Sequence, residues 1–135
     1  MSPAVTRRKL VHLTTYLSDL KKHKNVSNRE YWIHHYEIER LLQLIIEAAC
    51  DINAHLLIKM NQKPPSSYYQ SFIDLGKMGV LSQNLAEKLA PSSGLRNALV
   101  HLYEDIDEKA VRKSISLTLK YFPKYTRAIQ KYEKR

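Results

Sequence analysis

The amino-acid sequence predicts an all-α protein, a helical bundle with a long central helix and short connecting helices. Two observations support this fold class. Of 135 residues, 44% are hydrophobic but only 3 are Gly and 5 are Pro, so few positions suit tight turns. The hydrophobic residues also recur at helical spacing over long stretches. The length fits one domain, residues 1–135, which is large enough to bury a core unaided.

Two helices are predicted in the N-terminal half. The first spans residues 6–22 and has one apolar face, made by Leu10, Leu13, Leu17 and Leu20. The second spans residues 28–60, with Ser27 and Asn28 as candidate N-caps and Glu30 close behind. Its stripe is wide enough to pack on more than one neighbour, which predicts the central helix. The stripe comprises Ile38, Leu41, Leu42, Ile45, Ala48, Ala49, Ile52 and Leu56.

Short helices are predicted next. Pro64 and Pro65 end the long helix because proline cannot continue one. A third helix is expected over residues 67–77, with Phe72 and Leu75 facing inward. A fourth is expected over residues 83–89, capped by Ser82.

The last third of the sequence carries two proline signals. Residues 91–94, PSSG, are expected to break the chain before a fifth helix that starts near Leu95. The final helix is expected to be kinked or ended by Pro123. The end of the fifth helix has two alternatives, since the segment Asp105-Ile106-Asp107-Glu108 either caps a new helix or lies inside a bent one. The inward positions of the final helix are Val111, Ile115, Leu119 and Phe122.

The net charge of +9 indicates a polyanionic partner, nucleic acid above all. Basic residues alternate with tyrosines in the C-terminal segment KYFPKYTRAIQKYEKR. Such a pattern holds phosphates and stacks on unpaired bases, although it also suits an acidic partner protein or a simply solvated helix end. The candidate contact residues are Lys120, Lys124, Arg127 and Lys131.

Several classes are excluded by composition. The single cysteine, Cys50, permits neither an intramolecular disulfide nor a Cys-based zinc site, and it fits a reducing compartment. No run approaches the roughly 18 apolar residues of a membrane span. The segment LVHLTTYLSDLKK is too polar for a signal-peptide core. A cytoplasmic protein is therefore expected, with no membrane contact.

The stretch SGLRNALVHLYEDID, residues 93–107, holds the strongest candidate site. In a regular helix Arg96 and Tyr103 share one face, and Asn97 and His101 share another. His101 then lies about 140° around the helix from Arg96. Three arrangements bring them together: the arginine side chain reaches round, the helix is interrupted, or two chains each contribute half a site.

These residue types suit phosphodiester cleavage. Histidine is the usual general acid or base near neutral pH, and arginine binds phosphate and stabilises charge that builds up on it. With a substrate 2′-hydroxyl as nucleophile they suffice without metal or cofactor. Asn97 is placed to orient His101 one turn away. The structural alternative is an exposed Arg96 and a partly buried His101 satisfied by Asn97.

Two further groups have a functional and a structural interpretation. Glu47, Asp51 and His55 recur every four residues on the long helix, a spacing that can bind a divalent metal. We instead expect an Asp51–His55 pair that supports a neighbouring helix or the motif, and no metal site. An Asp51 that touches the motif would raise the pKa of a nearby histidine. Tyr68 and Tyr69 either stack on bases or cover the core, and core packing is expected.

The segment RNALVHLY resembles the Arg-x4-His-x-Tyr motif of the HepT-like toxins in the HEPN superfamily. The resemblance extends from Ile38 to Val111. It includes AACDINAHLL, KPPSSYYQSF, GKMGVLSQNLAEKLA and YEDIDEKAV, in that order. Two positions depart from the pattern: Leu95 replaces a frequent aromatic residue, and Leu102 a frequent polar one.

The resemblance implies a helical bundle that forms a homodimer, so that two motifs face a shared cleft. It implies a ribonuclease toxin, directed at tRNA in some members, with Arg96 and His101 as the catalytic pair and Asn97 as the polar residue after the arginine. It also implies control by a minimal nucleotidyltransferase antitoxin of the MntA type. That partner transfers AMP to the motif tyrosine, here Tyr103, and places a phosphate near Arg96.

A non-catalytic alternative stays open. The same bundle can serve as a HEPN-like module that binds a nucleotide or a nucleotidyltransferase without cutting RNA. The presence of both Arg96 and His101 favours the ribonuclease, since a scaffold requires neither.

Overall fold

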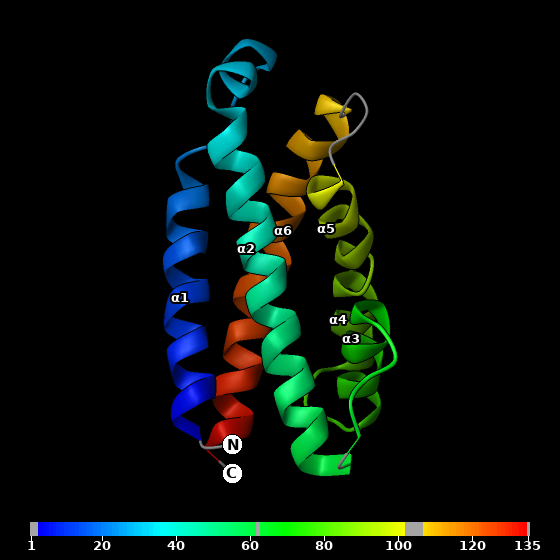
Figure 1. Cartoon of the computed structure of the whole chain (residues 1–135). Helices are drawn as coiled ribbons and strands as arrows, with labels where there is room; N and C mark the ends of the chain where they lie inside the picture. Colours follow the sequence, from blue (N-terminus) through cyan, green and yellow to red (C-terminus); the bar gives the residue numbers. More distant parts are fainter. Residues whose placement is uncertain (1–2, 62, 102–106, 135) are drawn as a thin grey trace.

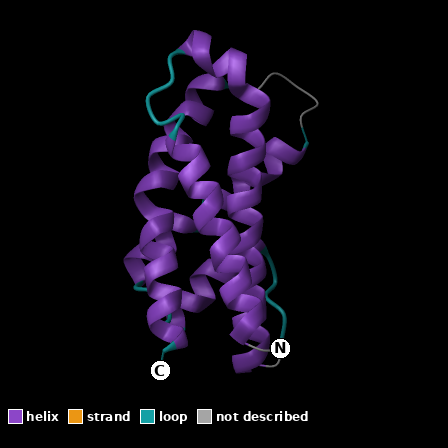
Figure 2. Cartoon of the chain, turned by 90° about the vertical axis from the view of Figure 1, so that its left-hand side faces the viewer, coloured by secondary structure: helices purple, strands orange, loops and turns teal. Residues whose placement is uncertain are grey.

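The computed structural model describes residues 3–61, 63–101 and 107–134. In these ranges it contains six α-helices and no strand, which confirms the all-α prediction. They are α1 (Pro3–Lys21), α2 (Asn28–Asn61), α3 (Tyr68–Lys77), α4 (Gln83–Leu89), α5 (Ser92–Val100) and α6 (Glu108–Glu133). The long helices α1, α2 and α6 run side by side, and α3, α4 and α5 stack as a fourth column (Figure 1). Seen from the side, α1 begins and α6 ends at the same end of the bundle (Figure 2).

The central position predicted for α2 is confirmed. This helix contacts α1, α3, α5 and α6. Its predicted stripe is buried, apart from Ala48, which is partly buried. Ser27 is the cap: its Oγ accepts from the Glu30 amide, and a Glu30 carboxylate oxygen accepts from the Ser27 amide, each at 3.1 Å. This reciprocal pair satisfies two amides that the first helical turn leaves without partners.

By length and composition alone, residues Asn28–Met60 are able to cross a membrane. However, 67% of their most apolar window is buried inside the bundle. A helix that packs on four neighbours has to be apolar over most of its circumference. The hydropathy of α2 therefore follows from its place in the core.

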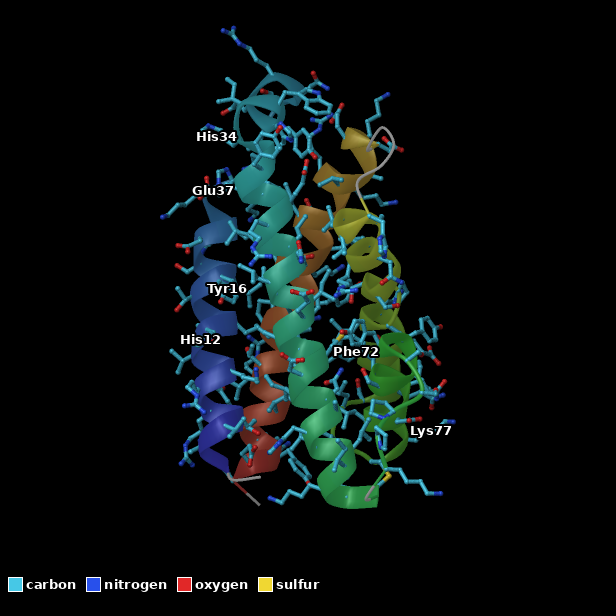
Figure 3. The ribbon with its side chains drawn as sticks, viewed as in Figure 1. His12, Tyr16, His34, Glu37, Phe72 and Lys77 are labelled. Atoms are coloured by element: carbon cyan, nitrogen blue, oxygen red, sulfur yellow. The ribbon has the colours of Figure 1, made fainter. Side chains whose placement is uncertain are left out.

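The fourth column is built as the sequence predicts at α3 and α4, where Ser67 and Ser82 cap the helices. Phe72 is fully buried and points toward α2, whereas Lys77 extends outward (Figure 3). Gly79 takes a φ of 79° in the turn that follows, a conformation that glycine adopts without a steric cost.

The expected break at residues 91–94 is wrong, because α5 begins at Ser92 directly after Pro91. Proline is tolerated here since a first helical turn needs no amide donor. The hydroxyls of Ser92 and Ser93 also donate hydrogen bonds to the backbone carbonyls of Leu89 and Ala90, at 2.6 and 2.9 Å. They satisfy the end of α4 without a loop between the two helices.

The final helix runs through its proline, so termination, one of the two effects expected of Pro123, does not occur. Asp107 caps α6, its side chain accepting from the amides of Lys109 and Ala110, so the first of the two alternatives, a cap for a new helix, is confirmed. From there α6 continues through Pro123 to Glu133. Apolar burial on both sides of Pro123, by Phe122, Tyr125 and Ile129 among others, offsets the cost of roughly 3 kcal/mol for an internal proline.

A buried hydrogen-bond network ties three helices together. Asn53 on α2 is fully buried. Its carbonyl oxygen accepts from the Tyr125 hydroxyl of α6 at 2.6 Å, and its amide donates to the Ser71 hydroxyl of α3 at 3.0 Å. Ser71 in turn donates to the backbone carbonyl of Tyr68 at 2.7 Å. The network fixes the relative register of α2, α3 and α6, because each buried polar atom needs its partner.

Replacing Tyr125 with Phe tests this network. The change leaves the Asn53 carbonyl without its buried donor, and we expect the free energy of unfolding to fall by about 1–3 kcal/mol. Urea denaturation measures this loss. Tyr121→Phe is the matched control, since no hydrogen bond of its hydroxyl is seen among the described residues, and it should leave stability nearly unchanged.

The stability of the bundle should depend on pH through His55. This side chain is buried, and its Nδ1 has no partner in the described part of the chain. Burial and nearby positive charge, including Lys59, lower its pKa below the ordinary 6.5. The folded state thus holds His55 neutral, whereas the unfolded chain binds a proton below pH 6.5.

The stability that the neutral His55 contributes is fully present above pH 6.5. It is lost as the pH falls toward the lowered pKa of His55 in the folded state. We expect His55→Gln to flatten the decline of unfolding free energy between about pH 7 and 5, by at most about 1.4 kcal/mol per pH unit. The exposed His12→Gln should leave the slope unchanged. Equal slopes for His55→Gln and the wild type would contradict this assignment.

Candidate active site

Arg96 projects from α5 and is held by two other helices. Its Nε and Nη2 both donate to Oε2 of Glu47 on α2, at 3.1 and 2.9 Å. Its guanidinium carbon lies 5.1 Å from the ring centre of Tyr68, at the start of α3. The Arg96 and Glu47 side chains are 22% and 29% exposed. The arginine is therefore oriented from one edge and one face while it stays within reach of solvent.

His101 lies where the helix stops. α5 ends at Val100, and His101 adopts φ −103° and ψ 60°, outside the helical region. Its backbone amide still donates to the carbonyl oxygen of Asn97 at 3.1 Å. Of the three arrangements considered for the motif, the interrupted helix is therefore present. The His101 side chain is exposed, which contradicts the alternative of a partly buried histidine.

The other motif residues are placed only in part. The side-chain oxygen of Asn97 lies 3.5 Å from Nη1 of Arg96, which puts Asn97 beside the guanidinium. Tyr103 and Leu102 fall outside the described residues. Leu95, where the family pattern favours an aromatic residue, is partly buried against the core.

The three polar residues spaced along α2 point to different partners. Glu47 binds Arg96, as described above. Asp51 is exposed and pairs with Lys9 of α1 at 3.2 Å, and His55 lies buried further along the helix. No group of three metal-binding side chains is found among the described residues. Asp51 thus supports a neighbouring helix, one of the two structural roles expected for it, while the predicted Asp51–His55 pair is not formed.

Two contacts of the site escape sequence reasoning. Glu47 and Arg96 are 49 positions apart, so no local spacing links them. Tyr68 was expected in the core, but its side chain and that of Tyr69 are 39% and 48% exposed, so that expectation is wrong. Tyr68, which follows the Pro64-Pro65 segment, lies at the surface beside Arg96.

The basic positions of the C-terminal segment lie on the outer face of α6. All four candidate residues are exposed. The tyrosines between them are not equivalent: Tyr125 is fully buried, whereas Tyr121 lies under the ammonium groups of Lys120 and Lys124, at 5.3 and 5.6 Å. Stacking of Tyr125 on a base is therefore excluded, and the cationic face remains.

Cys50 lies beneath the site on α2. It is buried and unpaired. Burial raises the pKa of its thiol to about 12, with a further rise from the nearby Asp51 carboxylate and an opposing effect of Arg96. The thiolate, which is the reactive form, is therefore scarce at neutral pH.

Solved structures of other proteins have the same fold. A tri-AMPylated HEPN toxin of Shewanella oneidensis, in complex with an MNT antitoxin, superposes with a TM-score of 0.83 at 21% identity, over 96% of this chain and 98% of that one. A cytosolic protein of unknown function from Bacillus subtilis gives 0.84 at 17% identity, over 98% and 90%. The chain thus shares its fold with both of these proteins.

Sequence comparison identifies the family of the chain. The ribonuclease HepT-like family model matches residues 12–129. The tRNA nuclease HepT of Aphanizomenon flos-aquae is 43% identical over 136 residues, covering 98% of this chain and 92% of the relative. A putative RNase of Archaeoglobus fulgidus is 33% identical over 92 residues, 65% and 69% of the two chains. The chain belongs to the ribonuclease HepT-like family, which confirms the predicted family and its enzyme class.

The burial of Cys50 gives a direct test of the packing under Arg96. We expect the native protein at pH 8 to react with a thiol reagent such as dithionitrobenzoate at least 100-fold more slowly than the urea-unfolded chain, because neither access nor thiolate is available. Absorbance of the released thionitrobenzoate measures both rates. Native reaction at the unfolded rate would show that the α2–α5 contact is open.

Proposed function

We propose that the chain is a metal-independent endoribonuclease toxin of a toxin–antitoxin system, and that it cleaves tRNA in the cytoplasm. The observation that carries this proposal is the arrangement at the end of α5. Arg96 is anchored by Glu47, and the exposed side chain of His101 lies directly after the last helical residue. The 43% identity to a protein named tRNA nuclease supports tRNA as the substrate class.

The proposed chemistry is an internal transfer at phosphorus. The substrate 2′-hydroxyl attacks the adjacent phosphate as the imidazole of His101 takes its proton. The new O2′–P bond forms and the P–O5′ bond breaks. The leaving 5′-oxygen receives the proton that the imidazole took up, so that the products are a 2′,3′-cyclic phosphate and a 5′-hydroxyl. Arg96 donates to the phosphate oxygens and stabilises their growing charge, a role that no metal has to fill.

We propose that the toxin acts as a homodimer. Three large apolar side chains stand exposed near the N-terminal end of α2: Trp32, Ile33 and Tyr36, at 48%, 64% and 78%. This end of α2 is joined to the start of α6 by the Asn28–Glu108 hydrogen bond, so the apolar patch lies near the start of α6. Exposed apolar patches mark interaction surfaces, and a second copy here brings two motifs together.

Control by a nucleotidyltransferase antitoxin of the MntA type completes the proposal. AMP on Tyr103 would add a phosphate that pairs with Arg96 in place of the substrate. The AMPylated state of the Shewanella oneidensis toxin is a precedent for the modification in this fold.

The exposed cations of α6 are proposed to contact RNA or the antitoxin. They are Lys120, Lys124, Arg127 and Lys131.

Removal of either catalytic side chain tests the function. Purified protein, with intact mass confirming that no AMP is attached, is incubated with total tRNA in EDTA. We expect wild-type cleavage, and a loss of at least about 100-fold in Arg96→Ala and His101→Ala. His12→Ala, which removes an exposed histidine of α1 (Figure 3), is the matched control.

Full activity of His101→Ala would refute its catalytic role. Absence of cleavage by unmodified wild type would instead favour the non-catalytic HEPN-like module, which binds a nucleotide or a nucleotidyltransferase.

A further inference from the structure

We propose that Glu47 is a positioning residue of this ribonuclease, which holds the Arg96 guanidinium with its outer edge turned to the scissile phosphate. This inference rests on the proposed function. Glu47 belongs to α2, outside the motif, and its role follows from which guanidinium atoms it contacts.

The contact occupies one edge of the guanidinium. A single carboxylate oxygen of Glu47 accepts from Nε at 3.1 Å and from Nη2 at 2.9 Å. Because the guanidinium is planar and rigid, two contacts on one edge fix its rotation within that plane. The second edge, formed by Nη1 and the remaining proton of Nη2, is the one that binds phosphate in a bidentate manner.

That second edge is open among the described residues. Its one neighbour there is the Asn97 side-chain oxygen, at 3.5 Å from Nη1, the upper limit for a hydrogen bond. A phosphate can displace this contact without breaking the Glu47 pair. The side-on geometry therefore favours orientation of Arg96 over competition between Glu47 and the substrate for the same donors.

A ring face restrains Arg96 from a second direction. Tyr68 lies 5.1 Å from the guanidinium carbon, within the range of a cation–π contact. The backbone of Tyr68 is itself held by Ser71, which bonds to the buried Asn53. Edge and face are thus both set by residues of other helices, Glu47 of α2 and Tyr68 of α3, so that Arg96 is positioned before RNA binds.

Positioning and competition predict opposite outcomes when the carboxylate is removed. If Glu47 competes with phosphate, its loss speeds cleavage. If Glu47 orients Arg96, its loss slows the chemical step even though the site becomes more positive and RNA binding is not weakened. A fall in kcat without a rise in KM therefore separates positioning from a general loss of affinity.

The test compares Glu47→Ala, Glu47→Gln and the exposed control Glu87→Ala in tRNA cleavage. We expect Glu47→Ala to lower kcat on the order of 100-fold, because misplacement by about 1 Å has that effect, with KM unchanged or reduced. Glu47→Gln should recover most of the rate, since its amide oxygen still accepts from Nε and Nη2. Glu87→Ala should match the wild type.

A signal from Arg96 itself reports the orientation of its guanidinium separately from the cleavage rate. In protein labelled with nitrogen-15 arginine, the Nε–H resonance that disappears in Arg96→Lys belongs to Arg96. We expect it to be sharp in the wild type and in Glu47→Gln, and broadened by solvent exchange in Glu47→Ala. Should Glu47→Ala fail to fold, Glu47→Asp, whose carboxylate falls one methylene short, is expected to show the same loss of kcat.

The outcomes distinguish this inference from the function on which it rests. Wild-type cleavage with an unchanged or faster Glu47→Ala would overturn positioning alone and leave the ribonuclease intact. Equal losses in Glu47→Ala and Glu47→Gln would also overturn it, because the charge and not the orientation would then matter. Absence of cleavage by the unmodified wild type would overturn both proposals, whatever the Nε–H resonance shows.

Discussion

The buried side chain of Asn53 constrains the structure more than any other single polar group. It lies in the middle of an apolar core, where an amide without partners destabilises the folded state. It is satisfied only when Tyr125 of α6 and Ser71 of α3 stand at the right height beside α2. A helix that slid by one turn would keep much of its apolar contact but lose these bonds. The network therefore selects one register among several that hydrophobic packing alone would allow.

The candidate site depends on that register. The backbone carbonyl of Tyr68 accepts a hydrogen bond from the Ser71 hydroxyl, and Arg96 is placed between Tyr68 and Glu47. The arginine is thus fixed by α2 and α3, although it belongs to α5. His101 is different, because it follows the last helical residue and has an exposed side chain. Arg96 is therefore held by contacts to two other helices, whereas His101 lies directly after the last residue of α5.

The periodic part of the fold could be predicted from sequence, because apolar faces repeat wherever helices bury one side. The leucines of α1 and the stripe of α2 are buried as expected, and Ser82 caps α4. The break expected at Pro91 does not form, and Pro123 does not end α6, since serine hydroxyls and tertiary packing compensate for the local cost of each proline. Glu47 was noticed only for its spacing from Asp51 and His55. Its partner lies on another helix, and only the folded chain brings the two together.

The ends of α1 and α6 lie together at one end of the bundle, while the C-terminal end of α5 lies toward the other (Figure 1). The central helix α2, with 34 residues, is itself about 50 Å long at 1.5 Å per residue, and the two sites lie toward opposite ends of it. A fluorescent protein or affinity tag fused to either terminus is therefore remote from His101. A short peptide joining the two ends would close the chain into a circle, with new termini available in the turn around Gly79. This architecture suits circular permutation and immobilisation through the termini, with the proposed catalytic end left facing solution.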